Sequence, residues 1–93
     1  MIHVLIERHI ATGLISTYQQ QLRTAMQQNY VAHGFVSGES FTDTNDDHHQ
    51  FLLCKWRTVQ DWQRWSRSAE RLELANTIKP VLSREERITI LEN

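Results

Sequence analysis

Three tryptophans, Trp56, Trp62 and Trp65, stand within ten positions of one another in the sequence. Trp62 and Trp65 are three residues apart, so on a helix they share one face. Such side chains can form an aromatic wall for a flat substrate, and an indole N–H can donate a hydrogen bond to a substrate oxygen. Aromatic residues at helical spacing also pack short helices onto sheets, and both interpretations fit the sequence.

A second group with possible chemistry is acidic and histidine-rich, and it comprises Asp43, Asp46, Asp47, His48 and His49. Carboxylates and imidazoles bind metals, but the group lacks a rigid ligand spacing such as two histidines four apart on a helix. Its acidic residues suit turns. We therefore expect a solvated hairpin loop and no metal site.

The single cysteine, Cys54, excludes an internal disulfide and a zinc site built on several thiolates. Because it lies within an apolar run, we expect a small buried residue rather than a nucleophile.

Composition and length exclude several classes of protein. The chain has 93 residues, and its ten Lys and Arg against eleven Asp and Glu argue against a dedicated nucleic-acid or membrane-surface binder. No run of about 18 apolar residues exists, so no membrane span is expected. Charged residues also follow Met1 too early for a signal peptide. We expect one cytoplasmic domain over residues 1–93.

The apolar pattern then indicates the elements that position these residues. Alternation predicts strands over Ile2–Arg8, Phe35–Phe41, His49–Arg57 and Glu86–Glu92, with a polar turn at Thr42–His48 joining the second and third. Helical spacing predicts a helix from Leu14 that stops before Gly34.

Two further helices are predicted between the last two strands. Thr58 with Asp61 caps one, and Ser68 caps the next. The apolar stripe of that later helix is Leu72, Ala75, Ile78 and Leu82. The resulting order is that of an α+β, ferredoxin-like βαββαβ sandwich with an antiparallel sheet.

Both faces of the predicted sheet carry apolar residues. In the third strand Phe51 and Leu53 oppose Leu52, Cys54 and Trp56, and Leu5 stands on the opposite side from Ile2, Val4 and Ile6. In the second strand, period two puts Phe35 and Phe41 on one side and Val36 on the other. One helix layer covers only one face, so the other needs a partner. We expect a homodimer packed through its sheet faces.

The segment Lys55–Arg71 resembles the antibiotic biosynthesis monooxygenase (ABM) domain family, in which a strand ends in Trp and a short helix with an aromatic pair follows. Gly34–Phe41 is similar to the family's glycine-led second strand, and the likeness runs from Ile2 to about Leu91. The resemblance implies a single ABM-like domain that forms a dimeric α+β barrel, with a pocket between sheet and helices in each subunit. The relatives that this resemblance implies include cofactor-free oxygenases that act on polycyclic phenols, quinol oxygenases and haem-degrading enzymes.

The haem-degrading branch uses an Asn near the end of the first strand and a His on a later helix as axial ligand. Ile6, or Glu7 with a one-residue shift, stands at the first position and Ala75 at the second. Ala75 has no donor atom, so haem degradation is disfavoured.

The phenol-oxygenating branch requires a base and a group that stabilises an anion, with no metal or flavin, because an electron-rich phenolate reduces dioxygen itself. Candidate bases are His3, His9 and Glu39, and Arg71 could stabilise the anion. Surface or dimer-interface positions are the commoner explanation for His3 and for Glu39.

The resemblance therefore implies a cofactor-independent monooxygenase or quinol oxygenase that acts on a small aromatic hydroxy compound. The catalytic residues would be His3, Glu39 and Arg71, and the substrate-binding residues Trp56, Trp62 and Trp65. The alternative is a non-catalytic dimeric domain that binds a small ligand or a protein partner.

The homodimer is directly testable. Sedimentation at micromolar concentration should give twice the mass of one chain, because a chain of this length buries only about two-thirds of its unfolded surface alone. A sedimenting species with the mass of one chain would contradict the prediction.

Overall fold

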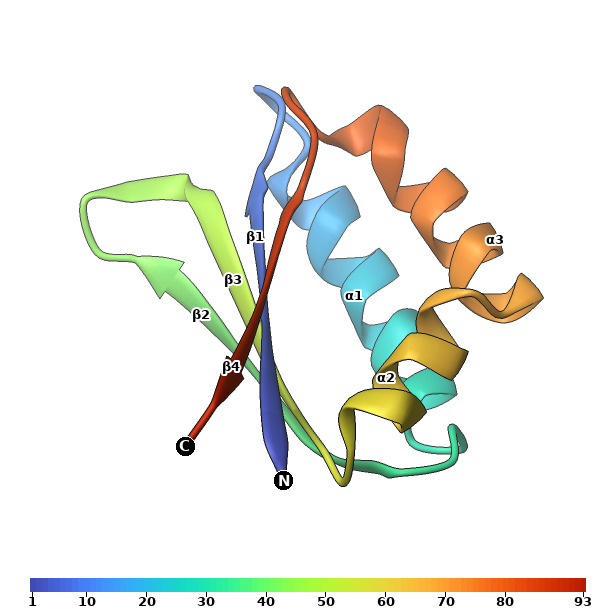
Figure 1. Cartoon of the computed structure of the whole chain (residues 1–93). Coiled ribbons are helices and arrows are strands. Elements are labelled where there is room, and N and C mark those ends of the chain that lie inside the picture. Colours follow the sequence, from blue (N-terminus) through green and yellow to red (C-terminus); the bar gives the residue numbers. More distant parts are fainter.

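One antiparallel sheet carries all three α-helices on the same side (Figure 1). This computed structural model describes every residue from Met1 to Asn93. In chain order the elements are β1 (Ile2–His9), α1 (Ile15–Asn29), β2 (Phe35–Asp43), β3 (Asp46–Trp56), α2 (Val59–Ser66), α3 (Ala69–Ile78), the 3₁₀ turn η1 (Lys79–Val81) and β4 (Arg87–Glu92). The strand order β2-β3-β1-β4 confirms the predicted ferredoxin-like α+β fold.

The core lies between the sheet and the helices. From β1 it receives Ile2, Val4 and Ile6, which alternate strictly with less buried residues. The other buried core residues include Tyr18, Leu22, Leu52, Cys54, Trp56, Trp62, Ile78 and Val81. None of the helices combines the length and apolarity that crossing a membrane requires.

The opposite face of the sheet, called the open face below, is also apolar. Leu5 lies directly opposite Leu53, and Phe41 lies opposite Phe51. Phe41 and Leu91 are 47% and 43% exposed. The prediction of two apolar faces is thus confirmed, whereas the homodimer that it implies stays a prediction.

A β-bulge between Phe35 and Ser37 corrects one prediction about β2. Phe35 pairs with Trp56 on the helix side, whereas Phe41 pairs with Phe51 on the open face. Simple alternation places both phenylalanines on one side, and this was wrong because the extra residue of a bulge reverses the alternation.

The hairpin and the last helix also differ from expectation. β2 ends at Asp43 and β3 begins at Asp46, so the turn between them is much shorter than the predicted Thr42–His48. In α3 the stripe is displaced: Arg71 and Ile78 are buried, Leu72 is 56% exposed, and Leu82 lies beyond the helix. The buried face of α3 therefore begins with the charged residue Arg71, and the spacing of apolar residues cannot predict a charged residue at such a position.

The two predicted caps are confirmed. The hydroxyl of Thr58 accepts a hydrogen bond from the Asp61 N–H at 3.1 Å, and the hydroxyl of Ser68 accepts one from the Arg71 N–H at 3.1 Å. Each side chain satisfies an N–H that the first helical turn leaves unpaired. These caps fix where α2 and α3 begin.

Gly34 joins the end of α1 to β2 in a way that only glycine allows. Its φ is +86°, and a methyl group added there would collide with the side chain of Asp61 on α2. Gly13 has a similar φ of +80° but nothing within 4 Å of an added methyl group.

The two glycines make a matched pair for measuring this packing. We expect Gly13→Ala to lower the free energy of unfolding by about 1 kcal/mol through the left-handed backbone alone. Gly34→Ala should cost about 3 kcal/mol, because it adds a steric clash in a buried site. Denaturant unfolding measures both, and equal losses would show that the contact between Gly34 and Asp61 is not tight.

Candidate functional site

A cavity of about 20 Å³ lies between the sheet and the helix layer. A single water needs roughly 10–15 Å³, so the space suits about one water. Its polar or charged wall residues are Arg8, Asn29 and Arg71, and its other lining residues are Ile6, Ala25, Leu52, Cys54, Trp56, Trp62, Trp65, Leu74 and Ile78.

The three tryptophans gather at this cavity. Trp56, at the end of β3, is 5.8 Å from Trp62 and 6.3 Å from Trp65 between ring centroids. Trp62 and Trp65 come from the same face of α2, as their spacing predicts. They form one aromatic wall.

Trp56 also carries an unpaired donor. Its side chain is 1% exposed, and its indole N–H is buried without a hydrogen-bond partner. Burying a donor in this way is costly, and such groups usually have a structural or functional reason. Trp56 is also one of the residues that line the cavity.

Arg8 and Arg71, which line the cavity, belong to an ion network with the partly buried Glu86. Glu86 accepts hydrogen bonds from Arg8 Nε at 3.0 Å and from Arg71 Nη2 at 2.8 Å, one on each oxygen. Arg8 also donates to the Tyr18 hydroxyl at 3.2 Å. Two guanidiniums share one carboxylate, so the network has a net positive charge beside the cavity.

Two pKa shifts reflect this environment. Burial opposes ionisation of Glu86, but Arg8 and Arg71 outweigh it, so the pKa of Glu86 lies below its ordinary value. Burial raises the pKa of Cys54 to about 11. The Cys54 thiol is therefore neutral near pH 7 and is not a nucleophile, as the sequence indicated.

The predicted site residues divide between the two faces of the sheet. Arg71 and the three tryptophans line the cavity. His3 and Glu39 pair with Lys55 and Leu53 on the open face, away from the cavity. Their catalytic role stays a prediction, and the structure does not bring them together with the tryptophans.

Sequence reasoning missed Arg8 and Glu86. One signal was available for Arg8, because it continues the buried alternation of Ile2, Val4 and Ile6 and is only 3% exposed. A charged residue at a core-facing strand position calls for a buried partner. Glu86 offered a similar signal, because the predicted strand Glu86–Glu92 puts it on the side of Ile88 and Ile90, although β4 itself begins only at Arg87.

A wider groove of about 400 Å³ lies between α1 and α3. Most of its lining side chains are amides and hydroxyls, among them Gln21, Thr24 and Thr77. Leu74 and Ile78 line both the groove and the cavity. Only these apolar side chains are common to the two spaces.

Comparison with known proteins places this geometry in context. Residues 1–77 match the family model described as antibiotic biosynthesis monooxygenase. No curated protein sequence matches the chain significantly.

Solved structures share the fold at low sequence identity. A conserved protein from Methanosarcina mazei matches with a TM-score of 0.91 at 13% identity, covering 99% of this chain and 91% of that one. An antibiotic biosynthesis monooxygenase matches with a TM-score of 0.88 at 13% identity, covering 100% and 98%. A variant of SnoaB, described as a cofactor-independent oxygenase from Streptomyces nogalater, matches with a TM-score of 0.86 at 11% identity, covering 99% and 92%. At these identities the likeness establishes the fold alone.

The ion network predicts an acid-dependent stability. The folded pKa of Glu86 is lowered, so its stabilisation is complete above the unfolded pKa of about 4.3 and is lost as pH falls through the folded value. At pH 7 we expect Glu86→Gln to lower the free energy of unfolding by about 3 kcal/mol, because two buried guanidiniums lose their counter-charge.

The exposed neighbour supplies the control. Glu85→Gln should change the stability by less than about 0.5 kcal/mol. Denaturant unfolding between pH 7 and pH 3 should show the difference between the two variants shrinking in acid. A constant difference would contradict the assignment.

Proposed function

Since the chain belongs to the antibiotic biosynthesis monooxygenase family, we propose that it is a cofactor-independent monooxygenase that acts on a small aromatic hydroxy compound. The observation that carries the proposal is that Trp56, whose buried indole N–H has no partner, lines a cavity together with two further tryptophans and two arginines that share one carboxylate. The description of SnoaB as a cofactor-independent oxygenase supports the same reaction class.

The proposed substrate oxygen binds as a phenolate. Trp56 donates its N–H to that oxygen, and Arg71 stabilises the negative charge through the excess positive charge of its network. A nearby positive charge lowers the pKa of a phenol. No histidine lines the cavity, and Glu86 is engaged by two guanidiniums, so the proton passes to solvent rather than to a protein base.

The electrons for the reaction come from the substrate. The phenolate reduces dioxygen, one oxygen atom becomes a new ring carbonyl, and the other leaves as water with the two hydrogens that the phenol loses. A phenol and dioxygen thus give a quinone and water in balance. The residues of this chain orient the ring against the wall formed by Trp62 and Trp65 and exclude bulk water.

A ring must displace side chains to enter. The cavity of about 20 Å³ is much smaller than an aromatic ring, whereas the adjoining groove offers about 400 Å³. Leu74 and Ile78 stand between the two spaces, so we propose them as the gate. His3 and Glu39 lie outside this path and take no part in this mechanism.

We also propose that two copies pack through their open faces. Leu5, Phe51 and Leu53 would then be covered by the same residues of a second copy, which forms the barrel that the sequence resemblance implies. Burial of these side chains would add the core that a single chain lacks.

A second candidate function is a non-catalytic domain that binds a small ligand or a protein partner. Two observations favour it: the cavity suits about one water, and no unengaged base lines it. A binding protein needs neither a base nor contact with dioxygen.

Oxygen uptake distinguishes the two functions. With naphthols and hydroquinones as substrates and a metal chelator present, we expect dioxygen consumption with formation of a naphthoquinone from a naphthol and of a hydroxyquinone from a hydroquinone. Trp56→Phe keeps the ring but removes the N–H, and should lower kcat/KM about 100-fold. Gln63→Ala, an exposed change on α2, should leave kcat/KM unchanged.

Other outcomes have definite meanings. Binding of the same compounds, seen as quenched tryptophan fluorescence, without oxygen uptake would favour the non-catalytic domain. If His3→Gln or Glu39→Gln abolished turnover while Trp56→Phe did not, the reaction would belong to the open face. If the compounds neither bind nor react, the proposed oxygenase is wrong, and so is a binding domain for aromatic hydroxy compounds.

A further inference from the structure

Three side chains of metal-binding type meet on the open face, at one end of the sheet. Glu7 and His9 are two residues apart on β1 and therefore point to the same face. His49 on β3 pairs directly with His9. One ligand atom from each of the three residues lies within 4.8 Å of the others.

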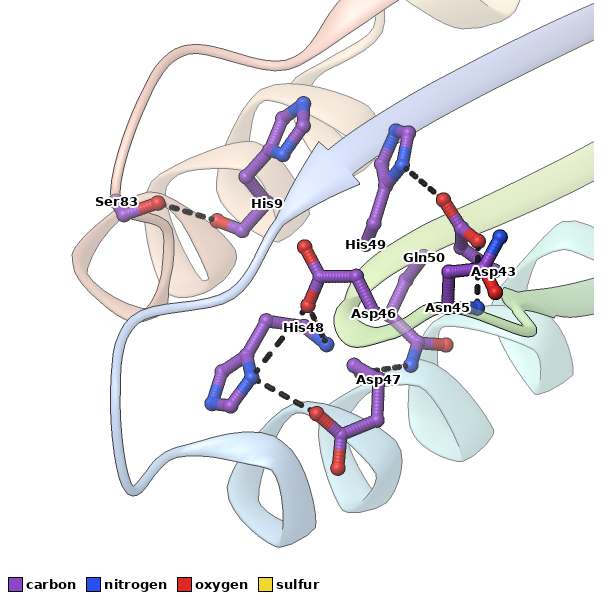
Figure 2. Close-up of polar contacts among 9 residues, drawn as sticks. All are labelled: His9, Asp43, Asn45, Asp46, Asp47, His48, His49, Gln50 and Ser83. Carbon is purple, nitrogen blue, oxygen red and sulfur yellow. Dashed lines mark hydrogen bonds and ion pairs between the residues drawn. The ribbon is translucent and has the colours of Figure 1, made fainter.

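His49 is held from both sides. Its Nδ1 is 3.0 Å from Asp43 Oδ2, and its Nε2 is 2.6 Å from Glu7 Oε1. Figure 2 shows Asp43 turned toward the ring of His49, with His9 beside it. When Nδ1 donates its proton to Asp43, the lone pair of Nε2 faces the carboxylate of Glu7. That arrangement is repulsive unless a proton or a cation lies between the two atoms.

The cluster also matches a divalent cation in charge. Glu7 and Asp43 supply two negative charges, and the two histidines are neutral when they act as ligands. A carboxylate that accepts the second ring N–H of a metal-binding histidine fixes its tautomer and raises its basicity. Asp43 stands in that position relative to His49.

We propose that Glu7, His9 and His49 bind one divalent transition-metal ion of the zinc type, with Asp43 as the positioning residue for His49. Two imidazoles and a carboxylate suit Zn²⁺ better than Mg²⁺ or Ca²⁺, which prefer oxygen ligands. In a single chain the Glu7 and His49 side chains are 25% and 19% exposed, so there water can occupy the fourth position.

Binding requires small side-chain movements. Ligand atoms around tetrahedral zinc lie about 3.3 Å apart, so Glu7 must withdraw slightly from His49. The rings of His9 and His49 are stacked at 4.3 Å with an interplanar angle of 11°. Parallel rings cannot both point at one ion, so the His9 ring must also turn about its side-chain bonds.

The proposed site takes Asp43 and His49 from the acidic and histidine-rich group in which the sequence predicted no metal site. The rest of that group, Asp46, Asp47 and His48, is separate from it. Asp46 and Asp47 lie near His48, and the carboxylate of Asp46 accepts the backbone N–H of His48 at 3.0 Å (Figure 2). Both aspartates are largely exposed. These contacts close the turn, and no carboxylate there orients His48 from a second strand.

Calorimetric titration of the untagged, chelator-treated protein with Zn²⁺ tests the site. We expect one ion per chain, and at least a tenfold loss of affinity in each of His9→Gln and His49→Gln. Asp43→Asn should weaken binding about tenfold, as loss of a carboxylate behind a histidine ligand does. His48→Gln, the matched control in the adjoining hairpin, should bind as the unchanged protein does.

A second readout keeps the test independent of any folding defect. Co²⁺ bound to the unchanged protein should give the visible absorption of a four-coordinate ion with nitrogen ligands. No saturable Zn²⁺ binding below millimolar concentration would overturn the proposal. Loss of binding in His48→Gln but not in His9→Gln would also overturn it, because the ion would then sit in the hairpin. Neither readout depends on turnover, so failure here is distinguishable from failure of the oxygenase.

Discussion

A single carboxylate shared between two buried guanidiniums links the helix layer to the sheet. Glu86 accepts hydrogen bonds from Arg8 of β1 and from Arg71 of α3, and it lies immediately before β4. None of these charges is stable in the interior without the others. The network therefore joins the central strand, the last helix and the segment that leads into the edge strand, and the same network gives the cavity its positive wall.

Features coded by neighbouring residues were predictable from sequence. The order of strands and helices follows from apolar spacing, and the starts of α2 and α3 follow from Thr58 and Ser68, whose hydroxyls act within three residues. The grouping of Trp62 and Trp65 on one face was equally local. Their proximity to Trp56 was also predictable, because β3 ends at Trp56 and α2 begins shortly after it, at Val59.

Features that depend on distant residues were not predictable in this way. Arg8 and Glu86 are separated by 78 positions, so no local pattern links them. The bulge at Phe35 depends on how β2 meets β3, and alternation alone misses it. The grouping of Glu7 and His9 with His49 requires the register between two strands that an α-helix and another strand separate in the chain.

β1 serves two surfaces at once, because its alternate residues reach the buried ion network on one side and the Glu7, His9 and His49 cluster on the other. It is paired on both flanks in unbroken register. A one-residue insertion or deletion within it would exchange the two faces, placing Glu7 and His9 beneath the helices and expelling Arg8. The edge strand β2 already accommodates an irregularity in its pairing. Evolutionary change in chain length is therefore tolerable at that edge, whereas the central strand can diverge only by substitution.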